Sequence, residues 1–210
     1  MIVLITDPRH DDISLATIVS EAARAIPSGN FAVLLRDHTR DDFNVTHLAT
    51  QLRKITRDHG HLFLVKHHHR RVAAEVGADG VHVNDRAPNA ATYREGWSDR
   101  VIVSVPAHSD TDVTHAATHG VDWVLVSPIF TTPNKGAPRG LSAIRNAAEI
   151  TSARASPKII ALGGVDASNA ASCLEAGADG IAVIRAILDA SDPFEASRAL
   201  WGAVIASKQR

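Results

Sequence analysis

A loop rich in polar and basic residues, residues 127–141, holds one group of side chains suited to binding phosphate. Its segment Ser-Pro-Ile-Phe-Thr-Thr-Pro-Asn-Lys-Gly carries hydroxyl, amide and ammonium groups, including those of Thr132, Asn134 and Lys135. An irregular loop of this kind can close over a polar ligand while a lysine meets an anionic leaving group. The segment therefore predicts part of a ligand-binding site.

Two short turns hold a second group of residues suited to phosphate. Gly163 and Gly164 follow the apolar run 158–162, and glycine lets backbone N–H groups approach an anion closely. Ile184 ends the apolar run 180–184 and Arg185 follows it, so that a helix N-terminus and a guanidinium could face the same anion. These four residues are candidate phosphate contacts.

A repeated phrase predicts the framework that positions these residues. Residues 75–83, 118–126 and 175–183 each place a glycine after a helical stretch, an aspartate just past the turn, and then a short apolar run. The unit is a helix, a tight turn and a strand, and repeating it builds a parallel sheet. Asp79, Asp122 and Asp179 are interpreted as punctuation between helix and strand rather than as catalysts.

The whole chain continues this alternation. Strands are expected at 2–6, 31–36, 62–66, 80–83, 101–105, 122–126, 158–162 and 180–184, and helices at 13–26, 45–59, 111–119, 141–153, 168–176 and 193–206. Eight strands with helices between them in 210 residues predict a compact (β/α)8 TIM barrel, one domain spanning 1–210. A doubly wound open sheet is the alternative, but no Gly-x-Gly-x-x-Gly turn follows the first run. In a barrel, phosphate commonly binds after strands seven and eight, where the two turns fall.

Composition narrows the classes of partner. The formal net charge is -1, which provides no general attraction to nucleic acid or to a membrane surface. No basic segment followed by an apolar stretch opens the chain, and no apolar run approaches the roughly 18 residues of a membrane span. We therefore expect a cytoplasmic protein with small phosphate-bearing substrates, and a homo-oligomer is compatible with the sequence. The single cysteine, Cys173, is expected to be a small core residue.

Motifs along essentially the whole length resemble the family of thiamine phosphate synthase and the related thiazole tautomerase. They are Leu-Ile-Thr-Asp at 4–7, Val-Leu-Leu-Arg-Asp at 33–37, Gly-Ala-Asp-Gly-Val-His at 77–82, Pro-Ile-Phe-Thr-Thr-Pro-Asn-Lys at 128–135, Ile-Ala-Leu-Gly-Gly at 160–164 and Gly-Ala-Asp-Gly-Ile-Ala at 177–182. The resemblance implies a synthase that joins an aminopyrimidine diphosphate to a thiazole phosphate, with Mg2+ assisting the departure of pyrophosphate. It places the thiazole phosphate on Gly164, Ile184 and Arg185, the thiazole beside Thr132 and Asn134, and the diphosphate beside Arg36 and Lys135.

The chain departs from the family pattern in the diphosphate and metal half of this site. Leu-Leu-Arg-Asp-His at 34–38 stands where the family reads Gln-Leu-Arg-Glu-Lys, and Lys-His-His-His-Arg-Arg at 66–71 stands where Asn-Asp-Arg would supply a metal ligand. The acidic ligand expected after the fourth strand falls at Ala87, with Asp85 two residues away, and Pro106 replaces a serine. Because Mg2+ prefers hard oxygen ligands, a conventional magnesium site is not predicted.

His67, His68 and His69 admit three interpretations. Imidazoles could bind a softer metal such as Zn2+ with Asp85 nearby, and His68 occupies the expected ligand position. Alternatively, Lys66, His68 and Arg70, or their neighbours, could bind the diphosphate directly without metal. The third interpretation is that the imidazoles are idle or serve a new ligand. Since residues leaving a strand alternate in direction, at most two of the three are expected to share a face.

The candidate catalytic residues are therefore Arg36, His38, His68 and Lys135, and the candidate substrate-binding residues are Thr132, Asn134, Gly163, Gly164, Ile184 and Arg185. A tautomerase is an alternative function. It needs only proton transfer, for which His38, His68 or His108 could be the base, although the family's histidine is replaced by Pro128. A barrel that binds thiazole phosphate or thiamine phosphate without turnover is the second alternative. His82 is interpreted as a hydrogen-bonded histidine inside the barrel or as a site residue.

Overall fold

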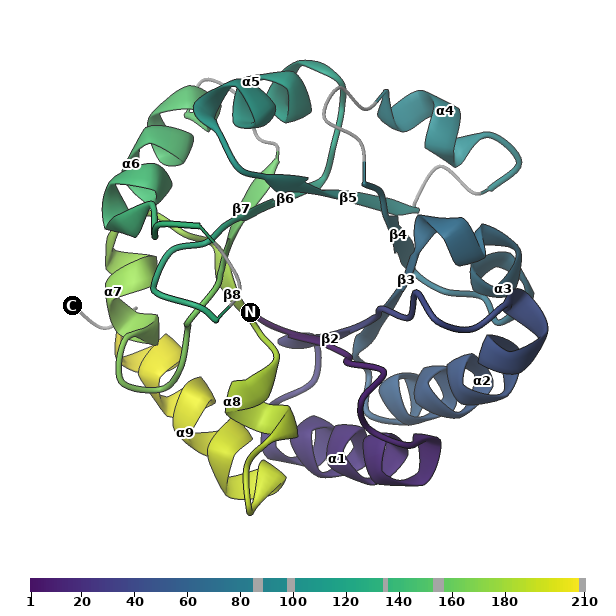
Figure 1. The fold of residues 1–210 in the computed structure, drawn as a ribbon. Helices are drawn as coiled ribbons and strands as arrows, with labels where there is room; N and C mark the ends of the chain where they lie inside the picture. Colours follow the sequence, from purple (N-terminus) through teal and green to yellow (C-terminus); the bar gives the residue numbers. More distant parts are fainter. Residues whose placement is uncertain (85–88, 98–100, 134–135, 153–156, 208–210) are drawn as a thin grey trace.

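The computed structural model describes residues 1–84, 89–97, 101–133, 136–152 and 157–207. Within them a ring of strands is surrounded by a ring of helices, and the chain proceeds around both rings in order (Figure 1). Three residues predicted to take part in the site, Asp85, Asn134 and Lys135, lie outside the described residues.

The eight predicted strands are present and form a closed barrel, β1 to β8 in chain order with β8 beside β1. Every neighbouring pair is parallel. The strands are β1 (Ile2–Ile5), β2 (Phe31–Leu35), β3 (Leu62–Lys66), β4 (Gly80–His82), β5 (Ile102–Ala107), β6 (Trp123–Val126), β7 (Lys158–Leu162) and β8 (Gly180–Val183). The TIM barrel is thereby confirmed and the open sheet excluded.

The helices cover the outside of the barrel. They are α1 (Asp12–Ala25), α2 (Asp42–Asp58), α3 (Arg70–Glu75), α4 (Ala90–Arg94), α5 (Asp110–Thr118), α6 (Gly140–Thr151), α7 (Ala170–Glu175), α8 (Arg185–Leu188) and α9 (Pro193–Ala206). The six expected helices are confirmed, α3 and α4 are additional short helices, and α8 is the short helix whose N-terminus was expected at Ile184 and Arg185. In the described part of the chain, no helix combines the length and apolar character needed to cross a bilayer.

Strand residues alternate between two hydrophobic layers. Outward residues such as Leu4, Val33 and Phe63 pack under the helices. Inward residues form a separate cluster along the barrel axis, made of Val3, Ile5, Ala32, Leu34, Leu64, Trp123, Leu125, Ile160 and Ala182. The alternation follows from the two-residue period of a strand. It also turns the last residue of β3, Lys66, toward the axis, in register with His82 of β4.

The three repeated aspartates clamp strands together at the amino end of the barrel. The carboxylates of Asp79, Asp122 and Asp179 accept hydrogen bonds from the N–H groups of the second residues of β3, β5 and β7, at 2.8, 2.7 and 2.7 Å respectively. Each aspartate N–H also donates to a carbonyl on that same neighbouring strand. These contacts explain the repeated phrase as a structural device and agree with its interpretation as punctuation. Cys173 is buried as expected, and burial raises the pKa of its thiol to about 11.

Candidate functional site

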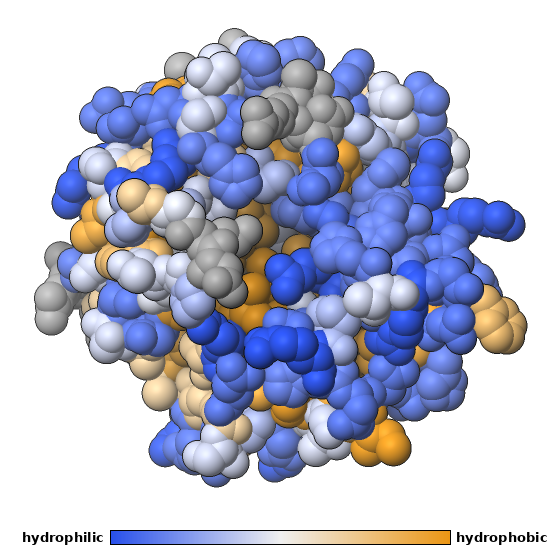
Figure 2. Space-filling view, viewed as in Figure 1, coloured by the Kyte–Doolittle hydropathy of each residue, from blue (hydrophilic) through white to orange (hydrophobic). Residues whose placement is uncertain are grey.

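A cavity of about 400 Å³ opens at the carboxyl end of the barrel. We call it the mouth cavity. Its floor is apolar and includes Ile5, Leu34, Leu125 and Leu162, which are inward residues of four strands. Figure 2 shows hydrophobic side chains in the hollow at the barrel axis with hydrophilic residues around it. The polar wall is basic and consists of Arg36, His38, Lys66, His82 and His108. The structure thus brings Arg36 and His38 together here, as the candidate site requires.

Burial and mutual repulsion shape the ionisation of this basic wall. Lys66 is 6% exposed, and its burial, followed by the charge of Arg36, lowers its pKa to about 8. Burial lowers the pKa of His38 as well, and positive charge on His68, Lys66 and Arg36 lowers it further. At neutral pH the wall therefore carries positive charge on the Lys66 ammonium and the Arg36 guanidinium, beside the imidazoles of His38 and His82, whose lowered pKa values favour the neutral form. A low-dielectric cavity with such charges favours an anion.

His82 is both packed and part of the cavity wall. Its Nδ1 lies 2.8 Å from Ser104 Oγ on β5, and it is 6% exposed. Burial, with Lys66 and Arg36 adding to it, lowers the pKa of His82 to about 3. The imidazole is therefore neutral at physiological pH and can offer a hydrogen bond to a ligand without adding charge. The two interpretations of this residue, barrel histidine and site residue, are compatible.

His108 follows β5 and is held against the start of the sixth loop. Its Nδ1 lies 3.1 Å from the carbonyl oxygen of Ser127 and 3.3 Å from the Ser127 hydroxyl. Both residues line the mouth cavity. This contact fixes the ring while the imidazole faces the cavity. His108 therefore remains a candidate for proton transfer.

A second cavity of about 460 Å³ lies beside the seventh and eighth strands. Its lining includes Thr132, Gly163, Gly164, Ile184 and Arg185, all predicted substrate contacts. Backbone N–H groups of Gly164 and Arg185 donate no hydrogen bond within the described residues and are available to a ligand. Arg185 is exposed and adds a guanidinium at the edge. Free amides and a cation together suit a phosphate group, so we call this the phosphate cavity.

The glycine pair has a second role, which the sequence did not indicate. Gly163 and Gly164 have φ values of 101° and 66°, which only glycine adopts readily. A Cβ on Gly164 would lie 2.7 Å from the carbonyl oxygen of Thr131 and 2.8 Å from Cβ of Phe130. The sixth loop therefore packs directly on the pair. Phe130 N–H donates to the carbonyl of Gly163 at 2.9 Å.

The two cavities share a wall. Thr132, Leu162, Gly163 and Ile184 line both. A phosphorylated molecule in the phosphate cavity can therefore extend its ring toward a second molecule in the mouth cavity. This placement brings two substrates together for a bimolecular reaction.

The three consecutive histidines hold loops together. They form a 3-10 turn, His67–His69, rather than continuing β3, so the expectation of alternating directions is wrong. His68 Nε2 donates to the carbonyl of Asp37 at 2.6 Å, and His69 joins that carbonyl to the Asp42 carboxylate. His67 packs edge-on against Tyr93, with ring centroids 4.7 Å apart.

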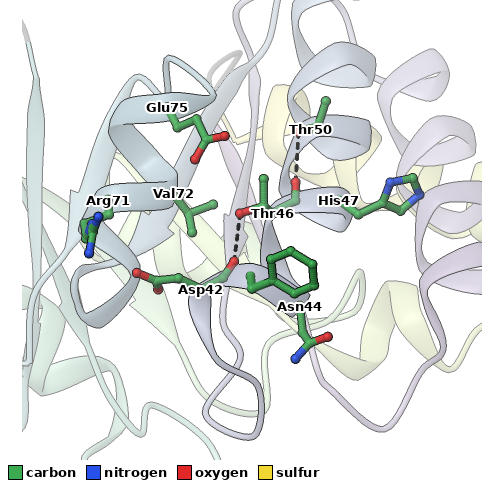
Figure 3. A pocket seen from close by; sticks show the side chains of 9 residues that line it. Asp42, Asn44, Thr46, His47, Thr50, Arg71, Val72 and Glu75 are labelled. Carbon is green, nitrogen blue, oxygen red and sulfur yellow. Dashed lines mark hydrogen bonds between the residues drawn. The ribbon is translucent and has the colours of Figure 1, made fainter.

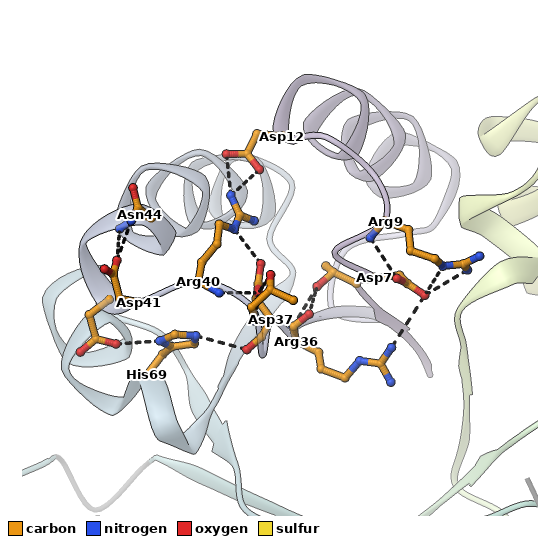
Figure 4. A network of polar contacts seen from close by, with 12 residues as sticks. Asp7, Arg9, Asp12, Arg36, Asp37, Arg40, Asp41, Asn44 and His69 are labelled. Atoms are coloured by element: carbon orange, nitrogen blue, oxygen red, sulfur yellow. Dashed lines mark hydrogen bonds and ion pairs between the residues drawn. The ribbon is translucent and has the colours of Figure 1, made fainter. Parts of the chain in front are cut away.

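A dense polar network surrounds these loops (Figure 4). The Asp37 carboxylate accepts hydrogen bonds from Thr39 and Arg40, and Arg40 also pairs with Asp12. Burial opposes the charge of Asp37, but these hydrogen bonds outweigh it and lower its pKa. Asp7 is similarly engaged by Arg9 at 3.1 Å and Arg36 at 3.8 Å. The carboxylates of Asp37 and Asp7 are therefore already paired with arginine side chains of the protein.

The donors in the mouth cavity do not fit Mg2+. Among the described residues, the cavity lining contains no carboxylate. Likewise, no group of three or more His, Cys, Asp or Glu side chains in the described ranges could hold a metal ion. His68, the candidate ligand, uses its Nε2 for a backbone carbonyl and does not line the cavity. A basic wall repels a divalent cation, whereas Mg2+ prefers oxygen ligands.

A larger cavity, about 760 Å³, lies outside the barrel between α2 and α3 (Figure 3). Its lining mixes acidic and basic side chains, including Asp42, His47, Arg71 and Glu75. Phe43 at its edge is 88% exposed. The groove carries side chains of both signs, and it lies outside the ring of strands, whereas barrels bind substrates within the ring at the carboxyl ends of the strands. The mouth and phosphate cavities therefore form the candidate active site.

Comparison with known proteins agrees with this geometry. The family model described as thiamine monophosphate synthase matches residues 2–187. Thiamine-phosphate synthases of Natronomonas pharaonis and Methanoculleus marisnigri are 35% and 34% identical to the chain, covering 96% and 90% of it and 93% and 89% of their own lengths. The solved thiamine phosphate pyrophosphorylase of Pyrococcus furiosus is 26% identical, with a TM-score of 0.83 over 98% of this chain and 96% of that one.

Proposed function

This chain belongs to the thiamine monophosphate synthase family, and we propose that it is a transferase that joins an aminopyrimidine diphosphate to a thiazole phosphate. The pair of abutting cavities is the observation that carries this proposal. The phosphate cavity would bind the thiazole phosphate through the Gly164 and Arg185 amides and the Arg185 guanidinium. The mouth cavity would bind the aminopyrimidine diphosphate against its basic wall.

The chemistry needs little from the protein beyond placement and charge. The bond between the pyrimidine methylene carbon and the diphosphate oxygen breaks, and its electron pair leaves with pyrophosphate. The thiazole nitrogen then donates its lone pair to that carbon, which forms the new C–N bond without a proton transfer. Negative charge grows on the departing diphosphate, so cations beside it lower the barrier. The apolar floor of the mouth cavity excludes water that would otherwise capture the carbocation.

The direct test is incubation with both substrates, followed by detection of thiamine phosphate by mass. We expect product, and we expect thiazole phosphate alone to raise the melting temperature as its concentration rises. No product together with no thermal shift at millimolar thiazole phosphate would refute the proposal.

A thiazole tautomerase is the second candidate, because His38 and His108 line the mouth cavity. Either imidazole could move a proton on a thiazole carboxylate phosphate. Isomerisation of that compound without the pyrimidine substrate would identify this activity. Tight phosphate binding with neither reaction would instead identify a non-catalytic binding protein.

A further inference from the structure

Lys66 is the most unusual charged residue of the mouth cavity. It is the last residue of β3 and follows Leu62 and Leu64 on the inward face, so its side chain enters the cavity rather than the solvent. Only 6% of the residue is exposed. A lysine in this position is a point charge placed directly above the apolar floor of the barrel.

The Lys66 ammonium pairs with no carboxylate in the part of the chain that the structure describes. Within the described residues, the Lys66 side chain makes no hydrogen bond or ion pair, and the only charge acting on its pKa is the like charge of Arg36. Its desolvation is uncompensated, as the lowered pKa of about 8 reflects. An unpaired buried charge is costly, and such groups occur where function requires them.

Arg36 beside it is also incompletely satisfied. The Arg36 Nε is buried and has no hydrogen-bond partner in the part of the chain that the structure describes. Its terminal nitrogen lies 3.8 Å from Asp7, whose carboxylate is closer to Arg9. Among the described residues, Lys66 therefore has no acceptor at this cavity and Arg36 has only the Asp7 carboxylate at 3.8 Å.

We infer that Lys66 and Arg36 bind the diphosphate of the pyrimidine substrate directly and together take over the charge neutralisation of a divalent metal ion. This inference rests on the proposed function. During the reaction the Lys66 ammonium stabilises the negative charge that the departing pyrophosphate receives with the C–O bonding pair. The diphosphate in turn supplies an anion to the buried Lys66 and to the partly exposed Arg36, so diphosphate binding by this chain is independent of Mg2+.

The histidine turn is a weaker candidate for this role. His68 and His69 donate to the Asp37 carbonyl, and His67 packs on Tyr93. None of the three lines the mouth cavity. Their contacts instead hold the loop after β3 against the loop after β2, which positions Arg36 and Lys66 on adjacent strands.

The test is the binding of inorganic pyrophosphate, measured by isothermal titration calorimetry in excess EDTA. We expect the unmodified protein to bind, Lys66→Met to lose at least tenfold in affinity, and Lys66→Arg to regain part of it. Lys158→Met is the matched control, because Lys158 is an exposed lysine at the opposite end of a barrel strand. It should bind as the unmodified protein does.

The outcomes separate this inference from the proposed function. Binding in EDTA that depends on Lys66 supports the inference whether or not thiamine phosphate is formed. Pyrophosphate binding that requires Mg2+, or equal affinity in folded Lys66→Met, overturns it. Thiamine phosphate formed only with Mg2+ would also overturn the inference while leaving the proposed transferase intact. Circular dichroism of each variant verifies folding.

Discussion

Replacing Lys66 with methionine should make the protein more stable at neutral pH. Methionine keeps the unbranched stem of lysine but removes the buried charge. The pKa of Lys66 is lowered from 10.5 to about 8, and each pH unit corresponds to about 1.4 kcal/mol. The charge therefore costs up to about 3 kcal/mol of unfolding free energy wherever the folded protein holds it.

The pH dependence identifies the cause. Below about pH 8 both folded and unfolded states keep the Lys66 proton, so the full cost applies. Between about pH 8 and 10.5 the folded protein releases the proton first, and the stability of the unmodified protein rises toward that of Lys66→Met. The lowered pKa values of His38 and His82 keep these imidazoles neutral between about pH 8 and 10.5, so they do not contribute to the change. Other lysines titrate in both proteins and cancel in the difference.

Urea denaturation followed by tryptophan fluorescence measures this difference, because Trp123 lies inside the barrel. The gain for Lys66→Met should approach about 3 kcal/mol near pH 7 and largely disappear above about pH 10.5. A difference that is the same at every pH, or a less stable variant at neutral pH, would refute the reasoning. Pyrophosphate should reduce the gap at neutral pH, because it binds the unmodified protein more tightly than Lys66→Met and stabilises it more.

Three other substitutions test the framework and the phosphate cavity. Gly164→Ala should lower the free energy of unfolding, measured by thermal denaturation, by about 1–3 kcal/mol, since φ is 66° and the sixth loop blocks the new methyl group. Gly202→Ala is the control, because a Cβ there would have no heavy atom within 4 Å, and it should not destabilise the protein. Equal effects of the two substitutions would contradict this explanation. Asp179→Ala should lower the free energy of unfolding in urea by about 1 kcal/mol or more, because it leaves the Ile159 N–H near the start of β7 without its acceptor. Asp58→Ala, on the exposed face of α2, should change stability little. Unchanged stability of Asp179→Ala would contradict the clamping role of this aspartate. Arg185→Gln should weaken the affinity for thiazole phosphate about tenfold, measured by calorimetry, and leave the affinity for pyrophosphate unchanged. The reverse pattern would show that the two substrates are assigned to the wrong cavities.

The barrel could be predicted from sequence because its strands are buried on both faces. Runs such as 62–66 and 158–162 are continuous and apolar, and the structure gives the same bounds. The short helices α3 and α4 were not expected, since six and five residues are too few to show a helical period. Their position follows from tertiary packing rather than from local pattern.

The site was predictable in its location but not in its internal contacts. Thr132, Gly163, Gly164, Ile184 and Arg185 meet at one cavity, as their places at strand ends indicated. The packing of Phe130 on Gly164 joins segments far apart in sequence, and no local pattern reports it. Two-residue alternation from Leu62 would have placed Lys66 inside the barrel, a signal that the neighbouring histidines obscured. His68 was a candidate site residue because it follows β3. The turn that directs its side chain toward the Asp37 carbonyl has no distinctive sequence and could not be foreseen.

The aspartate clamps reach both ways around the cylinder. The carboxylates of Asp79, Asp122 and Asp179 tie β3 to β4, β5 to β6 and β7 to β8. The backbone carbonyls of the same residues accept hydrogen bonds from Ile102 of β5, Lys158 of β7 and Met1 before β1. Each aspartate thus joins three consecutive strands at the base of the barrel, so the amides there should open to solvent together in hydrogen exchange rather than pair by pair.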